Sequence, residues 1–316
     1  GNSDTMTTDF AAVLGAGKPV VIDGGLATQC EALGYNIDGE LWSARLLQSN
    51  PRAIVEATRA YLDAGARIVA TASYQASRQG LVAAGLTAQE ADGLILSSVE
   101  LARQARDEFL ADNPGAEYPL VAISIGPYGA IVHDGSEYTG DYDISDADLR
   151  NFHEQRLRLL DTSDADLFIC ETVPSGRVAA LLAELLGEVS KPAWVSFSCR
   201  DAAHLADGTP VAAAAGHYRD HGNVLALGVN CVPPDIVLPL IAELQRAAPG
   251  KAIVVYPNSG ENYRSEDNSW HGTSTPLQCE QAAAEWVRAG ANLVGGCCRI
   301  GPGQIAAMSQ SITNTG

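Results

Sequence analysis

The sequence predicts an α/β protein built as a single (β/α)8 TIM barrel, because eight short apolar segments alternate with helix-like stretches along the chain. The segments are rich in β-branched residues and continuously apolar, as parallel strands covered on both faces are. No linker rich in Pro, Gly or Ser divides them, so we expect one barrel domain over residues 9–316. In chain order the predicted strands lie within 19–25, 66–73, 120–126, 166–173, 193–199, 224–231, 252–258 and 291–298.

The stretches between these segments have the apolar spacing of amphipathic helices. Ser145 is a favourable N-cap, the pair Pro233-Pro234 suits a helix start, and Gly290 suits a C-cap. These signals bound three of the four clearest predicted helices, which lie at 88–110, 146–160, 235–246 and 276–289.

An open doubly wound sheet is the competing architecture. It normally uses fewer strands and places a glycine-rich nucleotide loop after the first of them. The only similar loop, Gly15-Ala16-Gly17-Lys18, precedes a strand and lacks the third glycine, and no GxxxxGK[ST] sequence occurs. We therefore favour the barrel and expect no phosphate loop.

Composition excludes several classes of partner. The chain has 20 Lys and Arg against 38 Asp and Glu, a net charge of −18 with a pI near 4.6. This acidic balance, without any basic run, argues against nucleic acid and against anionic membranes. No apolar stretch approaches the roughly 18–20 residues of a membrane span. We expect a cytoplasmic protein with small-molecule partners, and oligomeric state stays open.

The cysteine content and the N-terminus agree with that compartment. Seven cysteines, an odd number spread through a long chain, do not resemble a secreted disulfide framework, so we expect thiols. Residues 1–8 are polar and have neither the basic nor the apolar region of a signal peptide. We expect this segment to be disordered or a remnant of cloning.

Polar side chains gather at the predicted carboxyl ends of strands, where (β/α)8 barrels carry their chemistry. Three thiols among them suit a zinc ion with an open coordination position. Both members of the adjacent cysteine pair can face one metal only if the chain leaves extended geometry, which Gly295-Gly296 permits. The alternative is that Cys298 packs in the core and Cys297 is incidental. The strand-end residues are Asp23, Thr71, Ser73, Glu171, Cys231, Asn258, Cys297 and Cys298.

Two carboxylates near a thiophilic metal suggest an amino-acid substrate. Asp23 and Glu171 end the first and fourth predicted strands and suit an ammonium group, although either side chain is also suited to cap a helix or loop. The backbone amides of Gly24 and Gly25 suit the substrate carboxylate.

His217 and His221 have the i, i+4 spacing of a metal pair on a predicted helix. Because they precede a strand, we expect them at the opposite mouth of the barrel, on a solvated face.

Three motifs together resemble the homocysteine S-methyltransferases, zinc enzymes on a (β/α)8 barrel. They are Asp23-Gly-Gly, Gly228-Val-Asn-Cys231 and Gly295-Gly-Cys-Cys-Arg299, and the resemblance extends over residues 20–299. Further segments are similar to the branch that uses S-methylmethionine or S-adenosylmethionine rather than betaine. These are 23–29 with 41–44, 72–77, 126–130, 134–142 and 256–261.

The resemblance implies zinc on Cys231, Cys297 and Cys298, and it implies that Asp23 and Glu171 hold the homocysteine amino group. It also implies that backbone around Gly24, Gly25 and Thr71 holds the carboxylate. Ser73, Asn230, Asn258 and Trp42 complete the expected substrate site. The implied reaction moves a methyl group from a sulfonium donor to the homocysteine thiol and gives methionine.

A sulfonium donor favours an aromatic face, for which Trp42 and Tyr128 are candidates, although each also suits loop packing. The loop Ile131-Val132-His133 departs from the family pattern, so the donor contacts stay open. The alternatives are selenocysteine as acceptor, a methylcobalamin protein as donor, and a non-catalytic zinc or thiol sensor that oxidises reversibly between Cys297 and Cys298.

Overall fold

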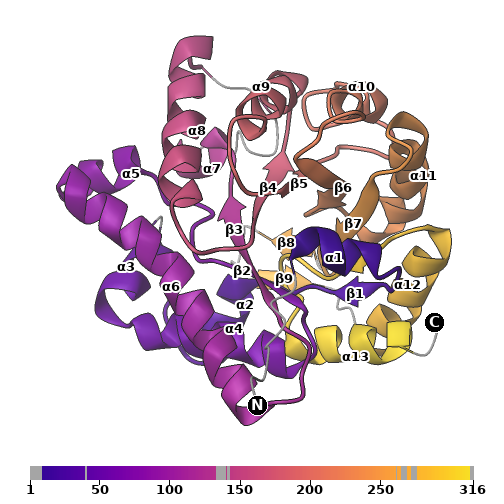
Figure 1. Cartoon of the computed structure of the whole chain (residues 1–316), viewed down its shortest axis with the longest axis horizontal. Coiled ribbons are helices and arrows are strands. Elements are labelled where there is room, and N and C mark those ends of the chain that lie inside the picture. Colours follow the sequence, from indigo (N-terminus) through magenta and orange to yellow (C-terminus); the bar gives the residue numbers. More distant parts are fainter. Residues whose placement is uncertain are drawn as a thin grey trace, which may run out of the picture.

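The computed structural model describes residues 9–39, 41–132, 140, 143–260, 262–264, 269–271 and 276–313. Eight parallel strands form one sheet in the order β1-β10-β7-β6-β5-β4-β3-β2. A parallel bridge between Ile22 and Ile68 joins its two ends, so the predicted barrel is confirmed (Figure 1). The strands are β1 Val20–Val21, β2 Ile68–Ala70, β3 Leu120–Ile125, β4 Leu167–Val173, β5 Ala193–Phe197, β6 Val224–Asn230, β7 Ala252–Tyr256 and β10 Leu293–Val294.

The eight strands fall inside the eight predicted segments, and helices surround them. All four of the clearest predicted helices are present within a few residues of their expected bounds. The helices are α1 Phe10–Gly15, α2 Leu26–Ala32, α3 Trp42–Ser49, α4 Pro51–Asp63, α5 Arg78–Ala83, α6 Ala88–Asp112, α7 Tyr128–Val132, α8 Asp146–Asp161, α9 Gly176–Leu186, α10 Val211–Gly216, η2 Pro234–Ile236, α11 Val237–Ala247, α12 Pro276–Ala289 and α13 Pro302–Thr313.

The helix ends have the expected chemistry. The Ser145 hydroxyl accepts the Asp148 N–H at the start of α8, and Gly290 after α12 has a φ of 123°, which glycine adopts without strain. The helix prediction for His217 and His221 is wrong, because α10 ends at Gly216. The imidazole of His221 instead bonds the Ala183 carbonyl of α9 and accepts the N–H groups of Asn223 and Val224 at the start of β6.

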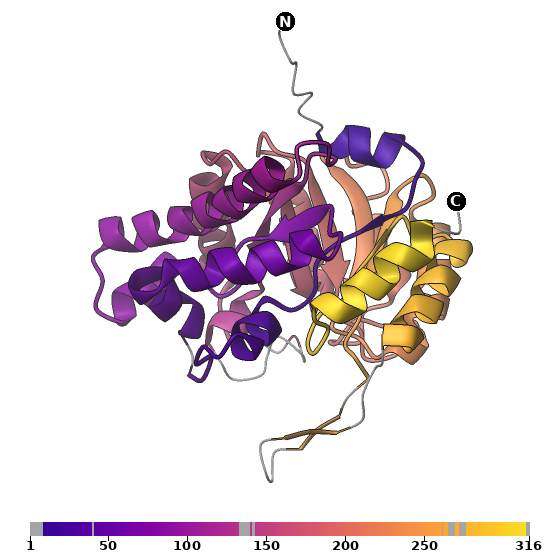
Figure 2. The ribbon, with the colours of Figure 1, turned by 90° about the horizontal axis from the view of Figure 1, so that it is seen from below.

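The amino ends of the strands form the lower end of the barrel, which α1 closes. The Phe10 side chain is fully buried there, and its ring lies 6.1 Å from that of Trp194 on β5. Figure 2 draws this lower end at the top of the picture, and the antiparallel hairpin of β8 (Asn262–Arg264) and β9 (Ser269–His271) lies at the opposite end of the molecule, at the bottom of the picture. Packing fills the interior from below, so a ligand site has room at the carboxyl ends of the strands, the upper end.

Among the described residues, no helix is both long and apolar enough to cross a membrane. The expected N-terminal segment 1–8 lies outside the described residues, as does most of the predicted 134–142 motif and His133 of the departing loop.

Candidate metal centre and substrate site

The three cysteines singled out in the sequence meet at the upper end of the barrel. Cys231 directly follows β6, and Cys297 and Cys298 lie in the turn after β10. Their Sγ atoms all lie within 4.8 Å of one another. One zinc ion about 2.3 Å from each thiolate needs sulfurs about 3.8 Å apart, a spacing inside that limit. The donor set therefore fits a thiophilic metal.

Close packing, and not only chain flexibility, explains the glycines before the cysteine pair. A Cβ atom on Gly295 would lie 2.4 Å from the Ile22 side chain, and one on Gly296 would lie 2.2 Å from Ile300. Neither glycine has a positive φ, whereas Cys231 and Arg299 do, at 53° and 66°. The bend predicted at the pair is therefore produced after the glycines, at Arg299, whereas the glycines themselves lie where the chain is pressed against Ile22 and Ile300.

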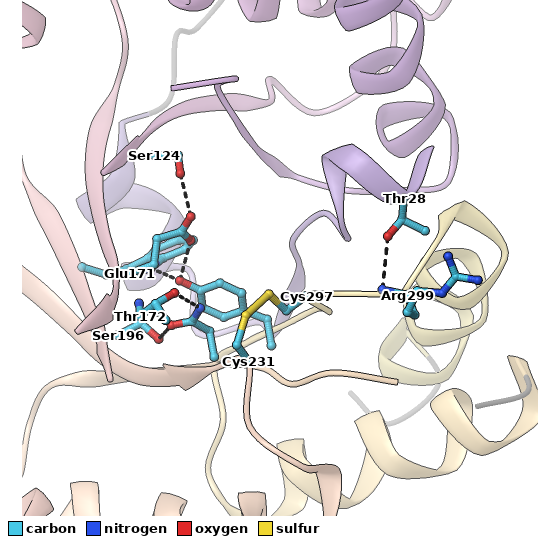
Figure 3. The surroundings of a disulfide bond; sticks show 11 residues. Thr28, Ser124, Glu171, Thr172, Ser196, Cys231, Cys297 and Arg299 are labelled. Carbon is cyan, nitrogen blue, oxygen red and sulfur yellow. Dashed lines mark hydrogen bonds between the residues drawn. A yellow bond between two sulfur atoms is a disulfide. The ribbon is translucent and has the colours of Figure 1, made fainter. Parts of the chain in front are cut away.

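In this structure Cys231 and Cys297 are joined by a disulfide, with Cα atoms 5.5 Å apart (Figure 3). This corrects two expectations: that all seven cysteines are thiols, and that an oxidised pair would be Cys297 with Cys298. Consecutive Cα atoms lie only about 3.8 Å apart, closer than the usual range for a disulfide, whereas Cys231 and Cys297 come from separate strands. The pair must be reduced before both sulfurs can bind a metal.

The same cavity contains the two predicted carboxylates. It has a volume of about 250 Å³, and Asp23, Glu171 and all three cysteines line it. Burial is the main cause that raises the pKa of each carboxyl to about 7, and for Asp23 the nearby Glu171 charge raises it further. Within the part of the chain that the structure describes, neither carboxyl forms an ion pair, so the two are suited to receive a cation such as an ammonium group.

Hydrogen bonds from three strands fix these carboxylates. The Ala70 N–H of β2 donates to Asp23 Oδ2 at 2.8 Å. Ser124 of β3 donates to Glu171 Oε2 at 2.6 Å, and the Tyr256 hydroxyl of β7 donates to Oε1 at 2.8 Å. These bonds orient both groups in advance of a ligand. A carboxylate oxygen can accept more than one hydrogen bond, so acceptor capacity remains for the ligand.

Asn230 orients the backbone beside Glu171. Its Oδ1 accepts the Thr172 N–H and the Ser196 hydroxyl, both at 2.8 Å, and its Nδ2 donates to Thr172 Oγ1. Thr172 has a φ of 58°, a strained region for a β-branched residue. The Asn230 amide thus stabilises the turn that orients Glu171. Asn230 is also the residue directly before Cys231 in the chain.

Most of the predicted substrate residues line the cavity, but two do not. Ser73 is fully buried and bonds Thr71 Oγ1 and the Ser124 carbonyl, so it supports the wall from behind. Asn258 lines a separate cavity between the sheet and α12, and its backbone N–H donates to Val232 O. The residues of the prediction that do line the site are Asp23, Gly24, Gly25, Trp42, Thr71, Glu171 and Asn230.

Two of the backbone amides expected to bind a carboxylate are already engaged. The N–H of Gly25 donates to Ile300 O, and that of Thr71 donates to Ala122 O. Gly24 is held close to Ile300, where a Cβ atom would lie 2.3 Å from its carbonyl oxygen. The Thr28 hydroxyl also lines the cavity and accepts the Arg299 N–H (Figure 3).

Sequence reasoning missed several wall residues. Trp42 lines the cavity as predicted, but Tyr128 packs edge-on against Phe152, with ring centroids 5.4 Å apart. The other aromatic residues of the wall are Tyr74 and Tyr256. Ser124 and Tyr256 bond Glu171 and were also missed. Both stand at the ends of strands, next to last in β3 and last in β7, so the strand-end rule contained the signal.

Comparison with known proteins gives one consistent family. Residues 20–312 match the family model described as homocysteine S-methyltransferase. The homocysteine S-methyltransferase YbgG of Bacillus subtilis is 42% identical over 303 residues, which is 94% of this chain and 96% of that protein. The crystal structure of the Escherichia coli homocysteine methyltransferase MmuM in its metallated form has a TM-score of 0.85 at 41% identity over 95% of this chain and 98% of that one. Its oxidized form has a TM-score of 0.87 at 40% identity, over 96% and 99%.

Proposed function

The chain belongs to the homocysteine S-methyltransferase family, and we propose that it transfers a methyl group from a sulfonium donor to the thiol of L-homocysteine. The resemblance predicted from the three motifs is thereby confirmed, and the protein is a methyltransferase. The substrate, the donor and the metal are the parts of this proposal that experiments must test.

One observation carries the proposal: three sulfur ligands and two half-buried carboxylates line the same cavity. A metal held by sulfur attracts a thiol, and the carboxylates attract an ammonium group. L-Homocysteine carries both groups at the two ends of a short chain, so it matches the two halves of the site.

Cys231, Cys297 and Cys298 would hold a zinc ion, which fits their soft thiolate donors. When bound, zinc would lower the pKa of the substrate thiol, so that the sulfur reacts as a thiolate. Thiolate ligands require a reducing environment, which supports cytoplasmic action.

The chain's own groups would place the amino acid. Asp23 and Glu171 would accept hydrogen bonds from the ammonium group. Because the amides of Gly25 and Thr71 are engaged, we assign the carboxylate to the Gly24 backbone and the Thr28 hydroxyl, which has a proton to donate. Asn230 contributes by orienting the Glu171 turn and not through a free amide.

The donor would enter over Trp42 and Tyr74. A sulfonium carries a positive charge on a carbon-rich group, and an aromatic face stabilises such a cation. Transfer neutralises both the thiolate and the sulfonium, so alignment and exclusion of water matter more than acid–base catalysis. S-Methylmethionine and S-adenosylmethionine share this chemistry, and we propose the sulfonium class.

The test is methionine formation by reduced, zinc-loaded protein given L-homocysteine with S-methylmethionine, S-adenosylmethionine or betaine. Turnover with a sulfonium donor and none with betaine is the expected result. Turnover that needs added methylcobalamin protein, or turnover by zinc-free protein, would contradict the proposal. L-Selenocysteine as a parallel acceptor tests how strictly the site selects homocysteine.

The Cys231–Cys297 disulfide favours a second candidate function, a thiol sensor. Oxidation of the two thiols releases two electrons and two protons to an oxidant and removes two metal ligands together. A sensor would bind zinc reversibly with redox state and transfer no methyl group. It leaves the fixed carboxylates Asp23 and Glu171 without a role, so methyl transfer accounts for more of the site.

A further inference from the structure

Tyr256 connects the two halves of the cavity. Its side chain is buried at 5% exposure and reaches from β7 to Glu171, which lies three strands away on β4. The phenol hydroxyl donates to Glu171 Oε1 at 2.8 Å, and its oxygen accepts the Trp194 indole N–H at 3.0 Å. The hydroxyl is thus fixed on both sides, and its position determines where one oxygen of Glu171 can lie.

The backbone of the same segment holds the cysteines. The carbonyl oxygen of Tyr256 accepts the Cys231 N–H at 3.3 Å, and that of Pro257 accepts the Cys297 N–H at 2.9 Å. Cys231 has a φ of 53°, so its orientation depends on such restraints. Two consecutive residues therefore restrain both cysteines through the backbone, and one of them restrains the carboxylate through its side chain.

We propose that Tyr256 is a positioning residue that sets the spacing between the ammonium and sulfur subsites and so selects homocysteine by chain length. This inference rests on the proposed function. The amino nitrogen and the sulfur of homocysteine are separated by three carbon atoms, and those of cysteine by two. A site with fixed spacing rejects the shorter amino thiol, because cysteine cannot reach both subsites at once. A missing methylene group costs about tenfold or more in a well-fitted site.

The experiment compares three thiols on wild type and Tyr256→Phe, namely L-homocysteine, L-cysteine and 4-mercaptobutanoate, which is homocysteine without its amino group. Loss of a hydrogen bond to a charged group predicts about a tenfold or larger fall in kcat/KM for homocysteine. The kcat/KM values for cysteine and 4-mercaptobutanoate should change less than threefold. The ratio of kcat/KM for homocysteine to that for each of the other two thiols therefore decreases. Calorimetric binding of homocysteine and 4-mercaptobutanoate provides a readout independent of turnover.

Tyr218→Phe is the matched control. Tyr218 is also fully buried, and its hydroxyl donates to the Ala179 carbonyl outside the cavity. This variant should lose stability without any change in the ratio of the three thiols. Zinc content and melting temperature are measured for every variant, so that loss of metal or of folding is recognised.

If Tyr256→Phe does not fold, Trp194→Phe removes the other bond to the phenol oxygen and should narrow the preference in the same direction. Equal losses for all three thiols, or an unchanged preference, would overturn the inference while leaving the proposed function intact. A wild type that treats homocysteine and 4-mercaptobutanoate alike would overturn the ammonium subsite itself, and the inference with it.

Discussion

At its lower end the barrel is closed by apolar packing between Phe10 and Trp194, whereas its upper end combines half-buried carboxylates, clustered sulfurs and strained backbone. All three non-glycine residues with positive φ among the described residues, Thr172, Cys231 and Arg299, lie at the upper end. The lower end thus has the apolar packing of a stable core. The upper end instead contains strained backbone and clustered polar groups, whose cost in stability bound ligands would offset. The difference predicts that loss of apolar packing below affects stability, whereas loss of the polar groups that line or support the cavity above affects function.

The largest expected effect is at the cysteine cluster. Cys298→Ala removes one ligand and spares the Cys231–Cys297 pair, so zinc content and methyl transfer should fall together, activity by about a thousandfold or more. The free energy of unfolding of the metal-free, reduced variant should lie within about 1 kcal/mol of the wild-type value, because the side chain is half-buried. Cys199→Ala, also half-buried but outside the cavity, is the control for a lost thiol. Full activity without zinc would sink the metal assignment.

The opposite effect is expected at the lower end. Phe10→Ala empties a fully buried site and should lower the free energy of unfolding by about 3 kcal/mol. Because α1 does not contact the cavity, KM for both substrates and kcat should stay within twofold at a temperature where the variant is folded. Urea unfolding measures the loss, with the exposed Leu33→Ala as control. A raised KM without a fall in the free energy of unfolding would contradict the expected difference between the two ends of the barrel.

The same contrast explains how much the sequence could predict. The strands and the main helices follow from local apolar patterning, and that patterning is reliable because the core lies on both faces of every strand. The cysteines, Asp23 and Glu171 could be placed together because the fold brings all strand ends to one mouth. Position along a strand was therefore enough to assemble the parts of the site.

Side-chain direction beyond the last strand residue could not be predicted. Tyr256 and Asn258 are two residues apart, and an extended strand would aim both at the same face. However, β7 ends at Tyr256, and Asn258 turns into the cavity beside α12. Thr71 and Ser73 differ in the same way, because β2 ends at Ala70. Side chains stop alternating between the two faces of the sheet where strand pairing ends, and the functional residues lie from that point on.

The pH dependence tests the charges of the upper end. Burial raises the pKa of Asp23 and of Glu171 to about 7, and both carboxyls must be ionised to bind an ammonium group. Each carboxyl goes from roughly one-tenth to three-quarters ionised between pH 6 and pH 7.5, so KM for homocysteine should fall by about 8-fold per carboxyl and by up to about 70-fold for the two together. The ratio of KM for homocysteine to KM for 4-mercaptobutanoate separates this effect from titration of the thiol, which both compounds share. A ratio that does not change with pH would contradict the assignment.

These raised pKa values also determine the sign of the stability change. Between about pH 4.5 and pH 7 the folded protein keeps protons on the two carboxyls that the unfolded chain has already released. The free energy of unfolding of the metal-free protein should therefore decrease as pH rises through this window. Asp23→Asn should flatten that dependence. A stability that rises with pH there and is unaffected by the substitution would show that other groups control it.

The smallest expected effect sharpens the comparison most, because it separates strain from function at one residue. Thr172→Gly removes a side chain from a left-handed conformation, a relief of about 1 kcal/mol, but it also removes the hydroxyl that bonds Asn230 Nδ2. The two effects nearly cancel, so stability should stay within about 1 kcal/mol. The turn that aims Glu171 becomes less restrained, and KM for homocysteine should rise about fivefold. Asn230→Ala removes the same bond from the other side together with the bonds to Thr172 N–H and Ser196, so the rise in KM of the double variant should be smaller than the product of the two single rises. Additive losses would mean that the two residues act separately and that the strained turn does not orient the carboxylate.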